Sequence, residues 1–142
     1  MEVMKRFLIS IALLLGMSAF FTSCNKDNGG SESNYSKLIV GSWEQAWYES
    51  YLNGKIVESE IGNGEIAVFT EKGKFYNKMS PNFIGDYSIS GNKLTISILI
   101  TTTATILKLT NTEMILEETA INSVFSGDKP IDKAIITFKR VE

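Results

Sequence analysis

The chain has no histidine and only one cysteine, Cys24, in its 142 residues. Without an imidazole base, Ser-His-Asp and Cys-His catalysis are excluded, and the usual zinc sites lose their nitrogen and sulfur ligands. Carboxylate, lysine, tyrosine and serine side chains are the groups left for chemistry. We therefore expect a protein that is not an enzyme and that has neither a metal nor another cofactor.

The sequence also lacks an excess of basic residues. Its net charge is −2, and residues 1–23 contain Lys5 and Arg6 against the single acid Glu2, so the rest of the chain is more acidic than the whole. Few phosphates can be neutralised by such a chain, which argues against a nucleic-acid partner. The glycines follow the spacing of turns and match no phosphate-binding loop.

Cys24 stands where an apolar run ends and a polar run begins. Lys5 and Arg6 precede the apolar residues 7–21, and this order is typical of a secretory signal. The run is shorter than the roughly 20 residues that a membrane-spanning helix needs. "FTSC" at 21–24 resembles a bacterial lipobox, with phenylalanine in place of the usual leucine. The resemblance implies cleavage before Cys24 and attachment of diacylglycerol and a further acyl chain, such as palmitate, to this residue.

The expected organisation follows from that site. Residues 1–23 are a lipoprotein signal peptide, residues 24–34 are the lipidated cysteine with a flexible Gly/Ser/Asn-rich tether, and residues 35–142 form one domain. Two or three acyl chains, at about 0.8 kcal/mol per buried methylene, hold such a domain on a membrane. We expect the outer membrane, on either face. The alternative is an uncleaved membrane anchor with a free cysteine.

The domain is predicted to be all-β, with one short helix at its start. In "NYSKLIVG", Asn34 can cap a helix and Gly41 can end it. Alternating, β-branched and aromatic segments follow, separated by short Gly or Asn turns that favour hairpins. The predicted strands are 42–51, 55–61, 65–70, 74–79, 84–90, 93–100, 103–109, 113–118 and 133–141. We expect an antiparallel meander of eight or nine strands that closes into a barrel and so removes its edges.

Alternation indicates which side chains face inward, with Phe75 and Met79 on one such face and Ile96 and Ile100 on another. The segment 120–132 interrupts the strands and is either a lid over one end or a plain surface connection.

Two motifs at opposite ends of the domain, "GSW" at 41–43 and "FKR" at 138–140, resemble those of the lipocalin superfamily. The layout "LIVGSWEQ", "VFTEKGKFYN", "GDYSISGNKLTIS" and "LKLTNTEMILEE" is similar to the lipocalin-like domains of Gram-negative lipoproteins. Alternation along the last strand places the Arg140 side chain inside the barrel. A guanidinium there requires a partner, and the ring of Trp43 can supply a cation-π contact. The resemblance likewise implies that this pair closes the barrel floor. The alternative is that Arg140 is a solvated charge.

Eight strands enclose an interior that side chains fill or that holds one small ligand. We therefore expect binding of a small hydrophobic molecule, without catalysis. The residues expected to line the site are Trp47, Phe75, Tyr87, Ile96, Met114 and Phe138. In the alternative, these side chains are simply core, and the protein is a structural module that docks on another envelope protein. An enzyme would instead show an Asp or Glu with a strongly perturbed pKa in a cleft.

Two groups of acidic residues are further candidates for a binding site. Glu58, Glu60 and Glu65 either share a cation such as calcium or form a soluble edge, and the second interpretation is favoured. Glu113, Glu117 and Glu118 are interpreted in the same way, as solvated surface carboxylates.

Overall fold

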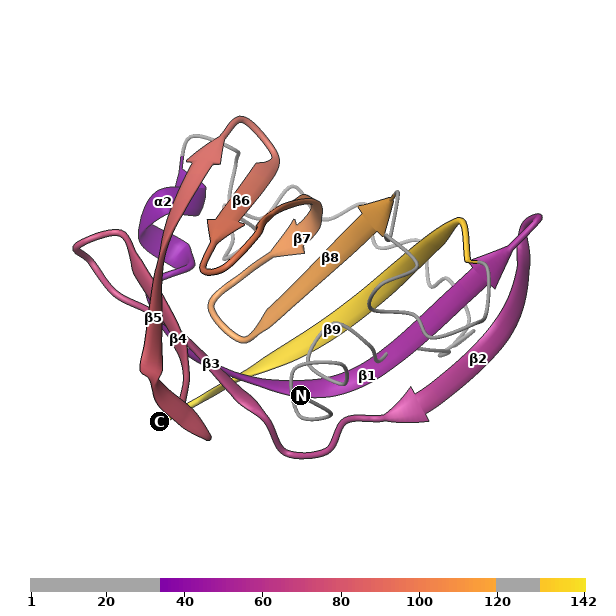
Figure 1. Ribbon diagram of the computed structural model, residues 1–142, viewed down its shortest axis with the longest axis horizontal. Helices are drawn as coiled ribbons and strands as arrows, with labels where there is room; N and C mark the ends of the chain where they lie inside the picture. The colour runs from indigo at the N-terminus through magenta and orange to yellow at the C-terminus, as the bar shows by residue number, and fades with distance from the viewer. Residues whose placement is uncertain (1–33, 120–130) are drawn as a thin grey trace, which may run out of the picture.

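The computed structural model describes residues 34–119 and 131–142. This part of the chain forms one short helix and an antiparallel sheet (Figure 1). The elements are α2 (Tyr35–Leu38), β1 (Gly41–Leu52), β2 (Lys55–Ile61), β3 (Ile66–Phe69), β4 (Lys74–Asn77), β5 (Ser80–Ser90), β6 (Lys93–Ser97), β7 (Thr101–Leu109), β8 (Glu113–Thr119) and β9 (Lys133–Val141). Every predicted strand is present, with bounds that differ by a few residues.

The sheet closes on itself. Its strand order is β2-β1-β3-β4-β5-β6-β7-β8-β9, and β1 also pairs with β9. Eight strands therefore form a closed antiparallel barrel, and β2 is an extra strand outside the ring. The prediction of an all-β meander that closes into a barrel, preceded by a short helix, is confirmed.

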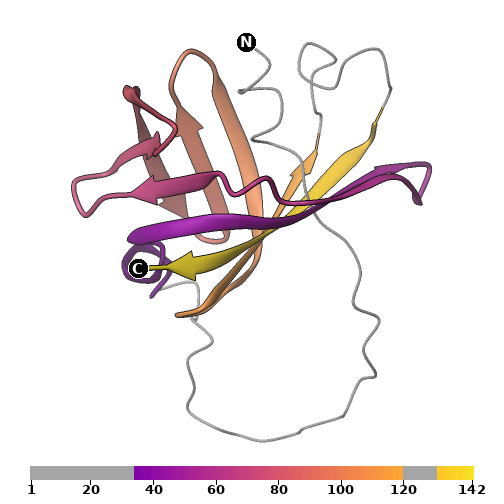
Figure 2. The same cartoon turned by 90° about the horizontal axis from the view of Figure 1, so that it is seen from below.

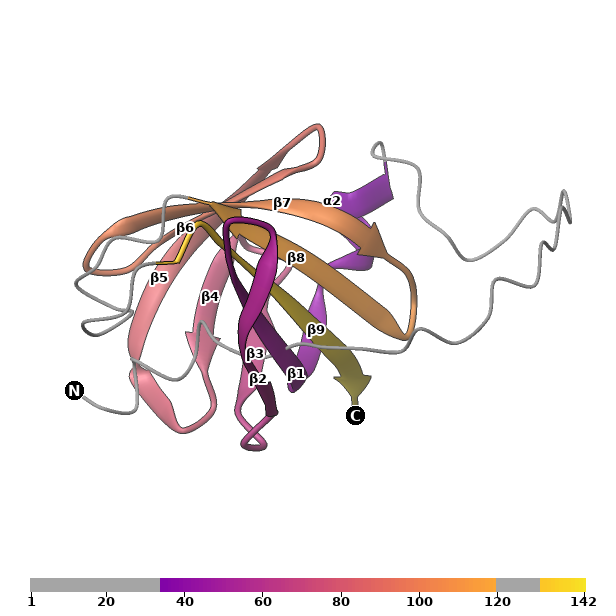
Figure 3. The same cartoon turned by 90° about the vertical axis from the view of Figure 1, so that its right-hand side faces the viewer.

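The two ends of the barrel differ because β1 changes its partner halfway along. Residues 41–44 of β1 pair with β3, whereas residues 47–52 pair with β2. On its other side β1 pairs with β9 over nearly its whole length. Figures 1 and 2 show β1, β2 and β9 extending together beyond β3 and β4, and in Figure 3 the β1–β2 hairpin lies in front of the barrel. The strands of the barrel are therefore long at β1 and β9 and short at β3 and β4.

A β-bulge in β1 reverses the alternation of its side chains. Gln45 lies opposite Phe138 and Trp47 lies opposite Thr137, so Ala46 is an extra residue in the strand. Because paired residues share a face, Trp47 lies on the face opposite to that of Trp43. The expectation that both indoles point inward is therefore wrong. Tyr48, opposite Ile136, takes the inward position instead.

Three local expectations also need correction. Asn34 is at the N-cap of α2 but makes no side-chain capping hydrogen bond. Gly41 does not end the helix, since Ile39 is the C-cap and Gly41 is the first residue of β1. Met79 and Ile100 are exposed because β4 ends at Asn77 and β6 at Ser97, which leaves both residues in turns.

Candidate functional site

One end of the barrel is sealed by Trp43 and Arg140. The two residues are direct partners across β1 and β9, and the guanidinium carbon lies 4.3 Å from the centroid of the Trp43 ring. Trp43 is fully buried, and its indole Nε1 donates a hydrogen bond to the carbonyl oxygen of Ile39 at 2.7 Å. The structure thus brings together the two residues that were expected to form the barrel floor.

The guanidinium of Arg140 also joins three separate segments by hydrogen bonds. Its Nη1 donates to the carbonyl oxygen of Val40 at 2.8 Å, and its Nη2 donates to that of Leu38. Its Nε donates to the carbonyl oxygen of Asn111 at 2.6 Å, in the turn between β7 and β8. Arg140 therefore fixes the last strand to the connection between α2 and β1 and to a second turn at the same end.

Above this floor the inner face is mainly apolar, with Gln45 as a buried polar residue. The register places Gln45, Phe138, Met114 and Leu109 in one row, and Tyr48, Ile136, Leu116 and Ile106 in the next. All of these residues are buried. The barrel interior is therefore an apolar core in its lower half.

Five of the six residues expected to line a ligand site lie on this inner face: Phe75, Tyr87, Ile96, Met114 and Phe138. The ring of Tyr87 meets that of Phe69 edge-on, with 5.0 Å between centroids, and its hydroxyl donates to the carbonyl oxygen of Thr70 at 2.7 Å. Trp47, the sixth, lies on the outer face. The role of the other five as ligand contacts stays a prediction.

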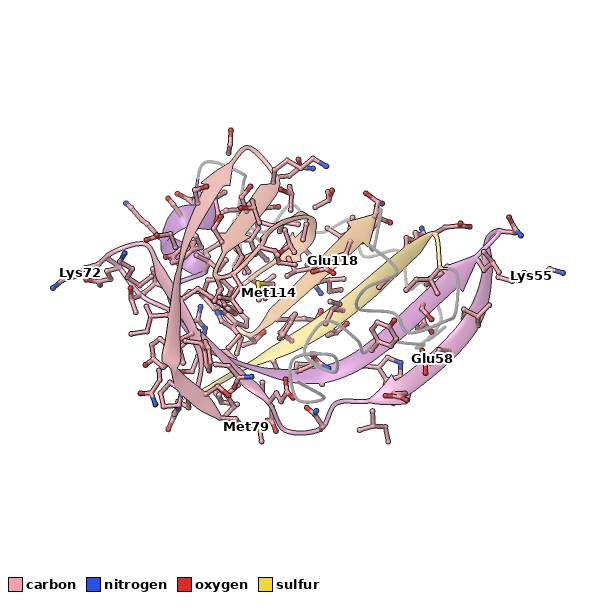
Figure 4. The ribbon with its side chains drawn as sticks, viewed as in Figure 1. Lys55, Glu58, Lys72, Met79, Met114 and Glu118 are labelled. Atoms are coloured by element: carbon pink, nitrogen blue, oxygen red, sulfur yellow. The ribbon has the colours of Figure 1, made fainter. Side chains whose placement is uncertain are left out.

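At the opposite end of the barrel, where β3 and β4 have only four residues each, the inner face becomes polar, and we call this the open end. One row runs across four neighbouring strands: Glu58 on β2 faces Ser50 on β1, Ser50 faces Ala134 on β9, and Ala134 faces Glu118 on β8. Ala104 on β7 continues the row beyond Glu118. Figure 4 shows Glu118 further along β8 than the core residue Met114, and Glu58 on the outlying strand β2. The side chains between the two carboxylates are short.

The hydroxyl groups of Tyr48 and Ser50 are buried in this region, and neither forms a hydrogen bond of normal geometry. The Tyr48 hydroxyl and Ser50 Oγ are inaccessible to solvent and have no partner of hydrogen-bond geometry, although the proximity of Ser50 acts to lower the pKa of Tyr48. Burial outweighs that effect and raises the pKa of Tyr48, with smaller contributions from the charges of Glu58, Glu118 and Glu60. Tyr48 is therefore a neutral hydroxyl near three carboxyl groups. Buried polar atoms without partners cost free energy, so the site favours a bound group that supplies hydrogen bonds.

Glu118 differs from Glu113 and Glu117, the two other acidic residues of the group that was expected to be solvated. Glu113 binds Lys108 at 2.6 Å and also Lys139, and these hydrogen bonds lower the pKa of its carboxyl. Glu117 pairs with Lys133 at 3.1 Å. Both point outward, whereas Glu118 points inward, and desolvation raises the pKa of its carboxyl to about 8.

Glu65 has a structural role. Its side chain is buried, and its carboxylate accepts hydrogen bonds from Asn63 Nδ2 at 3.0 Å and Asn77 Nδ2 at 3.4 Å. Glu65 therefore stabilises the segment between β2 and β3 and connects it with β4. Within residues 34–119 and 131–142, no cluster of three or more His, Cys, Asp or Glu residues could hold a metal ion.

The open end also carries exposed apolar side chains, which we call the apolar rim: Met79, Phe83, Ile84, Leu99 and Ile100. Met79 lies in the turn between β4 and β5, and Leu99 and Ile100 lie in the turn between β6 and β7. Phe83 and Ile84 belong to the first half of β5, whose start is at the same end. Exposed apolar side chains at the end of a barrel are available for contact with a ligand or a partner.

The sequence analysis missed the inward position of Glu118 and the site formed by Tyr48 and Ser50. Glu118 had a detectable signal, because it alternates with Met114 and Leu116, which are both buried. No sequence signal indicated that Tyr48 and Ser50 point inward, because the bulge at Ala46 cannot be recognised from the sequence. Cys24, the tether and most of the segment 120–132 lie outside the described residues.

In the described part of the chain, no helix has both the length and the apolar character needed to cross a membrane.

The chain was also compared with known proteins. No family model matches the sequence, and no curated protein matches it either.

Proposed function

We propose that this protein is a lipid-anchored protein of the cell envelope whose barrel binds a small, largely apolar molecule and performs no chemistry on it. The proposal combines the resemblance of residues 21–24 to a lipobox with the resemblance of the domain to lipocalin-like lipoprotein domains. The observation that carries it is the unequal closure of the barrel. One end is sealed by Trp43 and Arg140, and the other has a low wall at β3 and β4.

The inner face supports binding of an apolar molecule from the open end. Rows of buried aliphatic and aromatic side chains offer a surface that favours apolar groups, at about 25 cal/mol per Å² removed from water. The apolar rim at the open end would let such a molecule approach through a surface of similar polarity. Small-molecule sites are commonly found in the mouths of β-barrels.

A catalytic role has one observation in its favour, the raised pKa of Glu118. General acid-base catalysis needs a proton donor or acceptor within about 2.6–3.2 Å of the reacting group. No hydrogen bond joins Glu118 to Ser50, Tyr48 or another described residue, so the described part of this region shows no pairing of a base with a nucleophile. Binding is the function that this geometry favours.

The apolar rim favours a second candidate function, in which the barrel is filled and the rim docks on another envelope protein. The two functions differ in what the interior does. Native mass spectrometry of the chain, compared with its denatured mass, should reveal a bound molecule in the first case. Binding of N-phenylnaphthylamine, an uncharged fluorescent apolar probe, gives an independent measurement.

A pair of neighbouring variants tests the location of the probe. Ala104 is buried on the inner face of β7, and Thr103 beside it is exposed on the outer face. We expect Ala104→Leu to weaken probe binding about tenfold and Thr103→Leu to leave it unchanged. Equal binding by both variants and the parent would place the probe outside the barrel. Absence of probe binding and of extra mass would favour the docking function.

A further inference from the structure

The polar row at the open end bears on the kind of molecule that the barrel binds, and this inference rests on the proposed binding function. Four groups define the row and its neighbourhood: the carboxyl groups of Glu58 and Glu118, Ser50 Oγ between them, and the hydroxyl of Tyr48 one row below. Ser50 and Tyr48 are completely buried, and neither oxygen has a regular hydrogen-bond partner. The lower rows contain mainly apolar side chains.

We propose that the open end of the barrel binds the ammonium group of an amphipathic amine, whose hydrocarbon part lies on the apolar inner face. In this arrangement the ammonium hydrogens are donated to Glu118, to Ser50 Oγ and to the Tyr48 hydroxyl. An ammonium group has three donors and no acceptor, and all of these oxygens are acceptors. Glu58 contributes a second negative charge from β2.

The charges of the site favour a cation over an anion. The carboxyl groups of Glu58, Glu60 and Glu118 all lie close enough to Tyr48 to raise its pKa. The nearest lysine along β9, Lys133, lies on the outer face, where its Nζ pairs with Glu117 and stands 5.2 Å from the centroid of the Tyr51 ring. Among the described residues, no lysine or arginine pairs with Glu118. The negative charges that act on Tyr48 would repel a fatty acid carboxylate and attract an ammonium group.

The spacing of the carboxylates favours an organic cation over a metal ion. Glu58 and Glu118 are separated by two intervening strands, β1 and β9. At about 4.8 Å per strand, their backbones are about 14 Å apart. A metal ion such as calcium needs several oxygen ligands at about 2.3–2.6 Å. The described residues of this row do not bring together enough carboxylates for a metal ion, whereas an ammonium group can be held by one carboxyl and two hydroxyl oxygens.

The electrostatic state of Glu118 supports the same assignment. Desolvation raises the pKa of its carboxyl to about 8, because no cation compensates for the loss of water around the charged form. A bound ammonium would supply that missing charge and convert Glu118 to its carboxylate form. Hydrogen bonds to charged groups in such a setting are stronger than those between neutral groups.

Three ligands with the same hydrocarbon chain test the inference: decylamine, decanol and decanoate. Each is added to the full-length chain carrying Cys24→Ser, which prevents acylation at this position, and displacement of N-phenylnaphthylamine is measured. We expect decylamine to displace the probe at a concentration about tenfold lower than decanol, and decanoate to be the weakest of the three.

Glu118→Gln should remove the advantage of decylamine over decanol, so that the two ligands displace the probe at similar concentrations. Glu117→Gln is the matched control, since it removes the same charge from the neighbouring residue on the outer face. Circular dichroism checks that both variants fold. If Glu118→Gln does not fold, Glu58→Gln on the strand outside the ring takes its place, with an expected loss of about threefold.

The outcomes separate this inference from the proposed function. Equal affinities for decylamine and decanol, or a preference for decanoate, would overturn the assignment of an ammonium site while leaving apolar binding intact. Loss of decylamine affinity in Glu117→Gln to the same extent as in Glu118→Gln would also overturn it. Failure of the fluorescent probe and of all three ligands to bind would overturn the proposed function itself.

Discussion

The guanidinium of Arg140 lies against the ring of Trp43, 4.3 Å from its centroid, and thereby joins the first strand of the barrel to the last. The same guanidinium donates hydrogen bonds to the carbonyl oxygens of Leu38, Val40 and Asn111. One side chain therefore connects β9, the segment after α2 and the turn between β7 and β8. Its position explains why one end of the barrel is closed.

Arg140→Ala should lower the free energy of unfolding by about 1 to 3 kcal/mol, because it leaves several carbonyl oxygens without their donors and uncovers the Trp43 ring. Lys139→Ala is the control, since Lys139 is exposed and its ion pair with Glu113 lies on the outer surface. Urea denaturation followed by tryptophan fluorescence measures both. A change within about 0.5 kcal/mol for Arg140→Ala would show that the contact contributes little.

Gly41→Ala should destabilise the protein through the same contact. Gly41 has φ of +139°, and a Cβ there would overlap with Arg140 Nη1. Gly54→Ala is the control: its φ is +75°, but its Cβ would have no atom within 4 Å. We expect the larger loss at Gly41, by about 1 kcal/mol or more.

The double variant Gly41→Ala with Arg140→Ala shows whether the two effects are coupled. Its loss of stability should be smaller than the sum of the single losses, because the clash disappears with the arginine side chain. Strict additivity would mean that backbone conformation alone accounts for Gly41.

Stability should fall as pH rises from about 5 to about 8, because of Glu118. In the unfolded chain this carboxyl loses its proton near the ordinary glutamate pKa of 4.5, whereas in the folded protein desolvation keeps it protonated up to about pH 8. The folded state therefore binds more protons in this range, and the free energy of unfolding decreases with pH. Glu118 shares its row with Glu58 on β2, and Tyr48 on β1 lies in the next row, where the charges of Glu58, Glu60 and Glu118 act on it.

Urea denaturation at the two ends of this pH range measures the effect. The parent should lose about 1 to 3 kcal/mol more than Glu118→Gln does. The range is free of histidine titration because the chain has no histidine, and the lowered pKa of Glu113 acts below it. Identical pH dependence in the two proteins would exclude Glu118 as the cause.

Cys24→Ser should release the protein from membranes. If Cys24 carries the lipid, the variant should move from the detergent phase to the aqueous phase on phase separation, and it should not incorporate labelled palmitate. Ser23→Ala is a control at the adjacent position and should stay in the detergent phase. Unchanged partitioning of Cys24→Ser would mean that another part of the chain provides the attachment.

Most of the strands could be predicted from the sequence because their signals are local. The Asn53-Gly54 turn, for example, joins β1 and β2 as expected, and Asn53 has the positive φ of 52° that such a turn requires. The pairing of Trp43 with Arg140 could also be anticipated, because the parity of β9 is undisturbed from Ala134 to Arg140. Period-two alternation is reliable wherever a strand is regular.

The alternation failed where the strands are irregular. Bulges shift the register after Gln45 in β1 and after Ile106 in β7, and each depends on how two strands meet across the barrel. One extra residue, Ala46, moved Trp47 to the outer face and brought Tyr48 inside. Glu118 was missed for a different reason: its parity was clear, but carboxylates near a strand end were assumed to be solvated.

The sequence by itself determined the all-β class, the order of the strands and the identity of the pair at the barrel floor, because turns and alternating side chains act over a few residues. Only the tertiary structure decided which side chains meet at the open end. There the register of β2, β1, β9 and β8 aligns Glu58, Ser50 and Glu118 from distant parts of the chain. Such alignment depends on closure of the sheet and on its bulges, which local sequence does not specify.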